Sequence, residues 1–449
     1  MKLEGRIALG LDEFMLRLGH LKMLLGVLQK THGNRARIAR RLAETLTELV
    51  EVRGEDTQNL GAYLTRKKLC AVVHPDGSVT APHPKARYSH LRVTLDALGR
   101  VTGIEGPRDG PLRVWFQDFS LADPRTASKV GAVTADTREI SNKSGVSHLV
   151  DWASVLEIAN KRLGLTATGR ALATICGRQE AETEGSTASN PYVIGYESLA
   201  LSWIMFMADG DVLARLISRL SKITSLGKAD AIELVSELCN EMDAEARRGG
   251  SSASVTAVRA VRDFQRDLGI HSASRRAGPP SSTAWHRISS RLESLTDLGF
   301  LQKTDPSGAR RDHDYYYRPT EALIRASASL GEAGSPSDWA DNQLSEILAP
   351  ASSERPSARS CGPELLEAVR LCLGPTGIHI DSFALVAATL ALMHGKLLSP
   401  AEARERLRDL ALGHPDIARL SRGYAGSRAE FASISVAKLD QVGASGFYR

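Results

Sequence analysis

Asp312, His313 and Asp314 are the first residues whose types could do chemistry, because carboxylate and imidazole groups bind metal ions. They lie in a turn-rich polar segment, where such side chains are usually solvated. His74 and His83 flank another turn, each beside a proline, with no cysteine or third histidine close to them in the sequence. Neither set has the spacing of a metal-binding motif, so we predict no metal site.

The sequence also lacks the common motifs of nucleotide binding and hydrolysis. It contains no G-x-x-x-x-G-K-[ST], G-x-G-x-x-G, H-E-x-x-H or G-x-S-x-G segment. We therefore predict no catalytic residues and no cofactor, and a chain that is not an enzyme. A diverged metal-dependent nuclease stays open as an alternative, because its carboxylates need no fixed spacing along the chain.

Cysteine usage and hydropathy favour a cytoplasmic protein. The cysteines are odd in number and form no C-x-x-C pair, which is typical of a reducing compartment: Cys70, Cys176, Cys239, Cys361 and Cys372. The apolar stretch from Phe14 to Leu28 is broken by charged residues such as Arg17 and Lys22. It predicts an amphipathic helix and not a signal peptide or a membrane span.

Length, composition and charge indicate a multidomain globular protein with a basic N-terminal part. A chain of 449 residues, 42% hydrophobic and 24% charged, is long enough for two to four domains. Residues 1–100 hold 17 Lys and Arg against 10 Asp and Glu, whereas the rest holds 40 against 42. The basic part could face an anion such as a nucleic-acid backbone, or be a solvated helix surface.

Three segments rich in serine, glycine and proline read as linkers: 177–191, 271–283 and 331–363. They divide the chain into parts. We predict a basic N-terminal region with a folded module (1–120), a second and weaker module with its linker (121–190), a helical region ending in a module (191–330), a linker (331–363) and a C-terminal helical domain (364–449).

The most informative segment is 285–318. Trp285, Ile288, Leu292, Leu295 and Leu298 share one helical face, and the next residue is a glycine, as expected of a left-handed helix C-cap. A short strand is expected directly afterwards, then the polar loop TDPSGARRDHD, and a return strand with three tyrosines.

Two other segments show a similar order. The run 88–99 ends in Leu95-x-x-Leu98-Gly99, so we predict a helix over 86–98 followed by strand, loop and strand. Upstream of it, residues 70–81 are predicted to form two short strands about a turn. A weaker third copy at 148–172 has a helix, a short turn and the phrase LTATGRAL, read as a strand and the start of the next helix.

Helix, glycine, strand, loop and strand in this order resemble the end of a winged helix-turn-helix domain, and LTATGRAL is similar to the wing-to-helix passage of bacterial and archaeal members. The predicted fold class is therefore mainly α with small β-wings: tandem winged-helix modules plus a C-terminal helical domain. The resemblance implies DNA binding, as in many members, or contact with protein partners, as in the subunits of chromosome-organising and restriction complexes.

The predicted last helix of the 285–318 module is a poor reader of bases. A helix that enters the major groove carries Arg, Lys, Asn or Gln on its exposed face. The face opposite the apolar stripe holds His286, Ser290, Glu293 and Asp297, with Arg287 at the flank, and its two carboxylates would repel phosphates.

Basic residues elsewhere are better candidates for backbone contact. The predicted nucleic-acid-binding residues are Arg35, Arg37, Arg40, Arg41, Arg66, Lys67, Lys68, Arg275, Arg276, Arg287 and, in the wing, Arg310, Arg311 and His313. Arg35 to Arg41 begin a predicted helix over 35–50, where cations oppose the helix dipole and an anion would help.

The C-terminal part reads as helices. Phe383 to Met393 is apolar on nearly all sides and is predicted to be buried, and Ser399, Pro400 and Glu402 form a helix start with a capping box. The tail 421–449 is predicted to be partly disordered.

These observations favour a DNA-associated, non-catalytic subunit of a multiprotein assembly, with backbone contacts and little base selection. The resemblance implies a bacterial setting in genome defence, restriction or chromosome maintenance, and no membrane partner is expected. Besides the nuclease, the alternatives are a sequence-specific transcription regulator and a protein scaffold without DNA binding.

Overall fold

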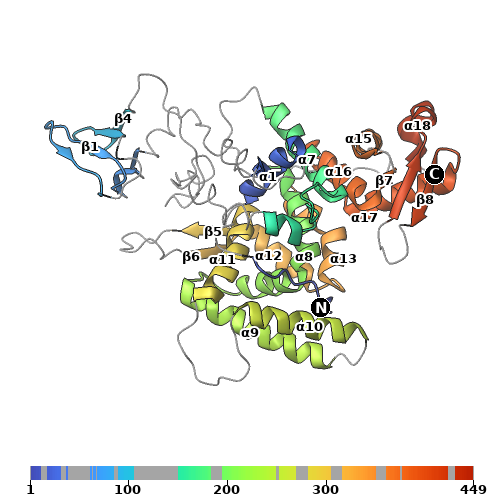
Figure 1. Ribbon diagram of the computed structural model, residues 1–449, viewed down its shortest axis with the longest axis horizontal. Coiled ribbons are helices and arrows are strands. Elements are labelled where there is room, and N and C mark those ends of the chain that lie inside the picture. Colours follow the sequence, from blue (N-terminus) through green and yellow to red (C-terminus); the bar gives the residue numbers. More distant parts are fainter. Residues whose placement is uncertain are drawn as a thin grey trace.

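The structure is a computed structural model of the 449-residue chain, and it is mainly helical with small sheets (Figure 1). It describes residues 2–11, 18–31, 37–38, 61–62, 64–66, 68–84, 89, 91–105, 150–183, 195–248, 252–268, 282–304, 316–349, 361–374, 377–422 and 430–447.

Most of the described helices and two of the described strands lie in the central body. They are α1 (Leu18–Lys30), α7 (Ala167–Thr183), α8 (Glu197–Leu220), α9 (Lys228–Arg248), α10 (Ser252–Asp267), α11 (Ser282–Asp297), β5 (Leu301–Thr304), β6 (Tyr316–Pro319), α12 (Glu321–Leu330), α13 (Pro336–Asn342) and α14 (Leu344–Leu348). The amphipathic helix predicted near the N-terminus is α1, whose leucines are buried.

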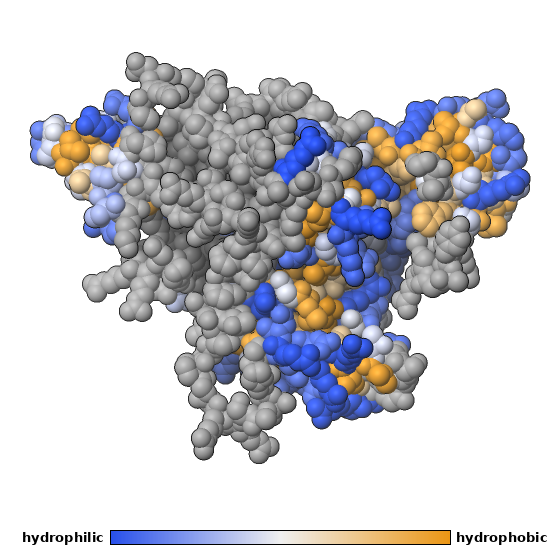
Figure 2. All heavy atoms as spheres, in the orientation of Figure 1, coloured by the Kyte–Doolittle hydropathy of each residue, from blue (hydrophilic) through white to orange (hydrophobic). Residues whose placement is uncertain are grey.

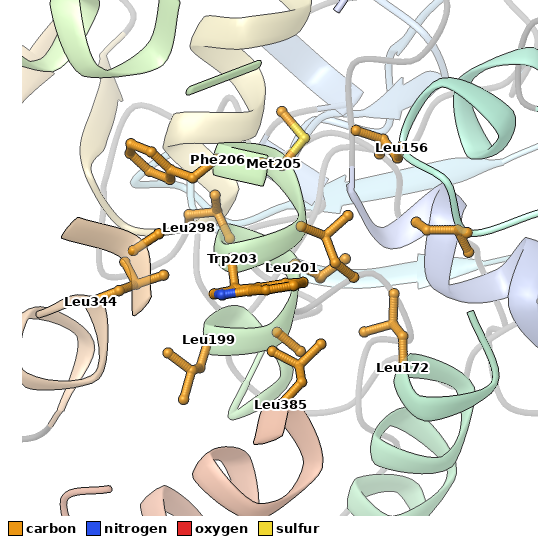
Figure 3. Packing of buried hydrophobic residues seen from close by; sticks show 14 of the residues in the cluster. Leu156, Leu172, Leu199, Leu201, Trp203, Met205, Phe206, Leu298, Leu344 and Leu385 are labelled. Carbon is orange, nitrogen blue, oxygen red and sulfur yellow. The ribbon is translucent and has the colours of Figure 1, made fainter. Parts of the chain in front are cut away.

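Helix α8 is the centre of the hydrophobic core. Its side chains are buried on nearly all sides, and Figure 3 shows Leu199, Leu201 and Trp203 of α8 among leucines that come from α7, α14 and α16. Most of the buried apolar residues that the structure describes, from Leu3 to Phe447, belong to one cluster. Removal of that apolar surface from water is the main stabilising contribution to the body.

A kink interrupts α8 at Asp209, whose backbone is non-helical (φ −132°, ψ 23°). The next residue, Gly210, faces α13, and a Cβ there would lie 2.9 Å from Cβ of Pro336. A glycine at this position therefore lets α13 approach the helix closely, while the kink turns the Asp209 carboxylate into the core.

A small four-stranded sheet lies in the N-terminal part, with strand order β2-β1-β3-β4. Its strands are β1 (Ala71–Val73), β2 (Val79–Thr80), β3 (Arg92–Leu95) and β4 (Val101–Glu105). The hairpin predicted over 70–81 is confirmed as β1 and β2. Buried residues of this sheet, such as Val72 and Val93, are outside the large core cluster.

The helix predicted over 86–98 is wrong where the structure describes this segment. Residues 92–95 form β3, parallel to β1 and antiparallel to β4. The Asp96 side chain accepts hydrogen bonds from the N–H groups of Leu98 and Arg100, so Gly99 (φ +73°) belongs to a tight turn and not to a helix end. Leu98 is 74% exposed, so the Leu-x-x-Leu-Gly pattern here does not mark a buried helical face. The second strand of that module falls in 106–149, outside the described residues.

The segment read as a third copy is a helix, a tight turn and a helix. Residues 150–155 are helical, the predicted strand is reduced to a single bridge between Ala159 and Leu165, and α7 begins at Ala167. The hydroxyl of Thr166 accepts the N–H of Gly169 at the start of α7. A Cβ on Gly169 would lie 2.0 Å from the carbonyl oxygen of Ile158, so the turn requires glycine here.

Two of the predicted linkers contain helix. Helices α13 and α14 lie within 331–363, and Trp339 is fully buried against Phe206 of α8, with ring centroids 4.8 Å apart. The linker prediction is therefore wrong over 336–348, because serine and proline there act as an N-cap and first-turn residue of α13. Helix α7 likewise extends to Thr183, into the segment 177–191.

The C-terminal part combines the predicted helices with an unpredicted sheet of order β7-β9-β8. Its elements are α15 (Gly362–Cys372), β7 (Ile378–His379), α16 (Ile380–Met393), α17 (Pro400–Gly413), β8 (Ala418–Arg422), β9 (Glu430–Ile434), α18 (Val436–Val442) and the 3-10 helix η2 (Gly443–Phe447). The predicted burial of α16 and the capping box of α17 are confirmed.

Residues 430–447 are folded, which corrects the disorder predicted for this part of the tail. Strand β9 pairs with both β7 and β8, and the side chain of Phe447 is fully buried. The tail contains few apolar residues, so its sequence does not predict a folded segment. Strand β9 is stabilised by pairing with β7 and β8, which precede it in the chain.

Candidate nucleic-acid interface

The segment 282–319 folds in the predicted order of helix, glycine, strand and return strand. Gly299 has φ +80° after α11, and β5 and β6 pair antiparallel from Leu301 opposite Pro319. Leu226, just before α9, adds a bridge to Tyr317, with N–H to O distances of 2.8 and 3.0 Å. The order of elements predicted for this segment is therefore confirmed, while the loop that carries Arg310, Arg311 and His313 lies outside the described residues.

Helix α11 is enclosed on the side that was predicted to face outward. Ser290 is fully buried and Glu293 is 2% exposed, and the hydroxyl of Tyr317 donates to Glu293 Oε1 at 2.6 Å. Asp297 accepts the N–H of Leu18 at the start of α1 at 2.7 Å. The predicted exposed face is thus wrong for these residues. Helix α9 and strand β5 pack against α11, and α1 and β6 add hydrogen bonds to Asp297 and Glu293. The side chain of His286 is outside the described part.

The N-terminal segment, residues 2–11, is held against α11 through Arg291. The Arg291 side chain is fully buried and forms a two-point ion pair with Asp209, with Nε to Oδ2 at 2.6 Å and Nη2 to Oδ1 at 3.1 Å. Ala8 completes the network, because its N–H donates to Asp209 at 2.9 Å and its carbonyl accepts from Arg291 at 2.8 Å. The guanidinium also lies 4.8 Å from the ring centre of Phe264.

Further contacts fix the rest of this segment. Asp211, buried in α8, accepts the backbone N–H groups of Glu4 and Arg6, at 3.1 and 2.8 Å. The Glu4 carboxylate accepts from the hydroxyl of Ser337 at 2.5 Å and from its N–H at 3.2 Å. Displacement of the segment would remove hydrogen-bond partners from three buried charged groups, Asp209, Asp211 and Arg291, so these contacts hold the segment against α8 and α11.

Arg287, a predicted DNA-binding residue, takes part in the same internal network. It donates to the carbonyl of Leu11 at 2.8 Å and lies 3.2 Å from Asp267 of α10, and its side chain is 19% exposed. These contacts account for its place at the flank of α11 and leave little of its guanidinium accessible to an external phosphate.

Only part of the predicted basic set is described. Arg37 is exposed on a short helical stretch, and Arg66 and Lys68 are exposed just before β1, where Lys68 has φ +54°. The remaining predicted residues lie outside the described part of the chain: Arg35, Arg40, Arg41, Lys67, Arg275, Arg276, Arg310, Arg311 and His313.

A row of arginines on α10 was missed by the sequence analysis. Arg259, Arg262 and Arg266 are exposed, with 86% of the Arg259 and 75% of the Arg266 side chain accessible to solvent. Their spacing of three and four residues places them on one helical face, and this spacing could have been found from the sequence. Figure 1 shows α9 and α10 side by side at the lower edge of the molecule.

Polar clusters in the C-terminal part have structural roles. The imidazole of His379 accepts the N–H of Ser382 and so caps α16, and the ring packs edge-on against Phe431. The buried carboxylate of Glu364 accepts from Lys396 at 2.7 Å and from His394 at 2.9 Å. Burial favours the protonated form of Glu364, but these bonds outweigh it and leave the pKa below its usual value.

The cysteine thiols and His74 are the next side chains that could act as nucleophiles, bases or metal ligands. Burial raises the pKa of Cys239 and Cys372 to about 12 and that of Cys70 to about 11, so these thiols carry little thiolate at neutral pH. His74 donates to or accepts from Thr80 at 2.7 Å within its hairpin. Among the described residues no group of three His, Cys, Asp or Glu side chains is arranged to hold a metal ion. No described helix is both long and apolar enough to cross a membrane.

Comparisons with protein-family models, curated proteins and solved structures found no match to this chain.

Proposed function

We propose that the chain is a DNA-associated, non-catalytic winged-helix subunit of a multiprotein assembly, and that it contacts the phosphate backbone without reading bases. The winged-helix resemblance would place such a subunit in bacterial genome defence, restriction or chromosome maintenance. Sequence selection would then belong to its partners.

The observation that carries this proposal is the enclosure of α11. A helix that reads bases must enter the major groove with its outer side chains free. Ser290, Glu293 and Arg291 are instead buried, and Arg291 is committed to Asp209. This favours a winged helix that serves as a rigid scaffold over the alternative of a sequence-specific regulator.

The test is binding of the purified full chain to fluorescently labelled duplexes of two unrelated sequences, measured by anisotropy from low to physiological salt. We expect equal affinities for the two sequences and a steep fall of affinity with salt, since backbone contacts release counterions. Strong preference for one of many sequences in a selection from random duplexes would support the regulator instead. No binding of any duplex at low salt would overturn the proposal and favour the protein scaffold.

The nuclease alternative is tested with the same material. Incubation of duplex and single-stranded DNA with Mg²⁺ or Mn²⁺ is expected to leave the DNA intact. Cleavage that persists after repurification and is abolished by a carboxylate substitution would contradict a non-catalytic role.

A further inference from the structure

We propose that the exposed face of α10, formed by Arg259, Arg262 and Arg266 and called here the α10 arginine face, is the surface that binds the phosphate backbone. This inference rests on the proposed function and assigns it to residues that the sequence analysis did not select.

The arginines are close enough to act together. At 1.5 Å per residue, Arg259 and Arg266 are about 10 Å apart along the helix axis, with Arg262 between them. One DNA strand presents a phosphate about every 3.4 Å along the duplex axis, so this length matches about three phosphates of one strand. Each guanidinium can bind a phosphate through two parallel hydrogen bonds.

The face carries little opposing charge. Asp263 is the single carboxylate of α10 within it, at 3.1 Å from Arg266 and 3.9 Å from Arg259. Arg262 has no ion-pair partner among the described residues. The adjacent α9 also carries exposed carboxylates: Asp230, Glu233, Glu237 and Glu241. Glu241 pairs with Arg219, and no ion pair joins any of the four to the α10 arginines in the described part of the chain. Three guanidinium groups against one carboxylate leave a local excess of positive charge.

The opposite side of α10 is anchored, so the arginine face has a fixed direction. Val261, Phe264 and Leu268 are fully buried in the core cluster. Near the end of the helix, Asp267 accepts the N–H of Gly10 at 3.0 Å and pairs with Arg287 of α11. Rigid support of this kind lowers the entropic cost of ordering the side chains on a ligand.

The chemistry of the surface favours a nucleic acid over an acidic protein. Protein interfaces usually depend on a central aromatic or aliphatic anchor that becomes buried. Val255, an exposed aliphatic residue, lies one turn before Arg259 at the beginning of α10. Between Arg259 and Arg266 the exposed face of the helix has no large apolar residue. Figure 2 shows mostly hydrophilic residues over the lower part of the molecule, where α9 and α10 lie, with smaller apolar patches.

The experiment compares two triple variants of the full chain in duplex-DNA binding across a salt series. One is Arg259→Ala/Arg262→Ala/Arg266→Ala. The control, Arg100→Ala/Arg162→Ala/Arg419→Ala, removes the same charge from exposed arginines on other elements. Thermal unfolding of both checks that they are folded. We expect the α10 variant to lose more than about tenfold in affinity and its salt dependence to fall by about 2 to 3 in log–log slope, while the control stays within about threefold of the wild type.

A variant with more positive charge tests the same surface while all three arginines are kept. Asp263→Asn removes the opposing carboxylate, and we expect about threefold tighter DNA binding at low salt. An unchanged affinity would count against contact at this face.

The outcomes separate the two proposals. Failure of the wild type to bind DNA would overturn the proposed function. Binding by the wild type with equal affinities of the α10 and control variants would overturn only the assignment of the surface. Tighter binding of poly-L-glutamate than of duplex DNA at equal charge concentration would also overturn the assignment of the surface, and would favour an acidic protein as the partner.

Discussion

Helices α10 and α11 are neighbours in the chain and both carry arginines, yet the two sets have opposite environments. Arg291 of α11 is fully buried and its donors are used by Asp209, Ala8 and the carbonyl of Arg287. Arg259 of α10 is 86% exposed and has a distant partner at 3.9 Å. A guanidinium withdrawn from water must be satisfied by internal acceptors, whereas an exposed one is held weakly and is free for a ligand. One helix therefore serves stability and the other is the better candidate for binding.

The largest expected difference in the free energy of unfolding is between Arg291→Ala and Arg262→Ala. Loss of Arg291 leaves the Asp209 carboxylate buried without its partner and is expected to cost about 3–5 kcal/mol in the free energy of unfolding. Arg262→Ala is expected to change it by less than about 0.5 kcal/mol. Urea unfolding followed by circular dichroism measures both, and similar values for the two variants would break the comparison.

The next largest effect is expected at Asp211, which holds the N-terminal segment. Asp211→Ala leaves the N–H groups of Glu4 and Arg6 without their acceptor, at a cost of about 2–3 kcal/mol. The release of residues 2–11 is expected to appear as faster hydrogen exchange at Ala8 and Gly10. Asp263→Ala on α10 is the control, and slow exchange in both variants would mean that the segment is held by other contacts.

Neighbouring tyrosines of β6 test the outward side of α11. Tyr317 donates to the buried Glu293, whereas Tyr316 is 40% exposed. Tyr317→Phe removes a donor to a buried carboxylate and is expected to cost about 1–2 kcal/mol, and Tyr316→Phe close to nothing. Equal unfolding midpoints in urea would contradict the enclosure of this side of the helix.

The smallest expected change in stability is for a substitution at the C-terminal end of α11. Gly299 adopts φ +80° with open space around its Cα, so Gly299→Ala suffers only from the left-handed backbone, at about 1 kcal/mol. Gly177→Ala within α7 also meets no neighbouring atom but has helical backbone, and it is expected to stabilise slightly. Thermal unfolding should therefore shift in opposite directions for the two variants.

Local patterns predicted correctly those elements whose signals lie within a few residues. The apolar stripe of α11, the glycine after it and the strands β5 and β6 are of this kind, as is the capping box of Ser399 and Glu402 at α17. A capping box and an apolar helical stripe each depend on residues that are close together in the sequence. They can therefore be recognised without knowledge of the rest of the fold.

The pattern Leu95-x-x-Leu98-Gly99 failed because the same spacing fits a strand followed by a tight turn. Val93 lies in β3, and its pairing with β1 decides between the alternatives. The buried Trp339 in a predicted linker shows the same limitation, since its partner Phe206 is far away in the sequence. Pairing and packing between distant segments override weak local preferences.

By itself the sequence determined the helical class of the chain, the order of elements around α11 and the burial of α16, because these follow from periodicity and capping. The tertiary structure alone decided which polar residues are exposed. Ser290 and Glu293 were expected to face outward, but both are buried. Tyr317 of β6 donates to Glu293, and Arg291 is buried with Asp209 from α8. Exposure depends on what packs against a helix from elsewhere in the chain. The spacing of the α10 arginines can therefore be found in the sequence, whereas their exposure is known only from the folded protein.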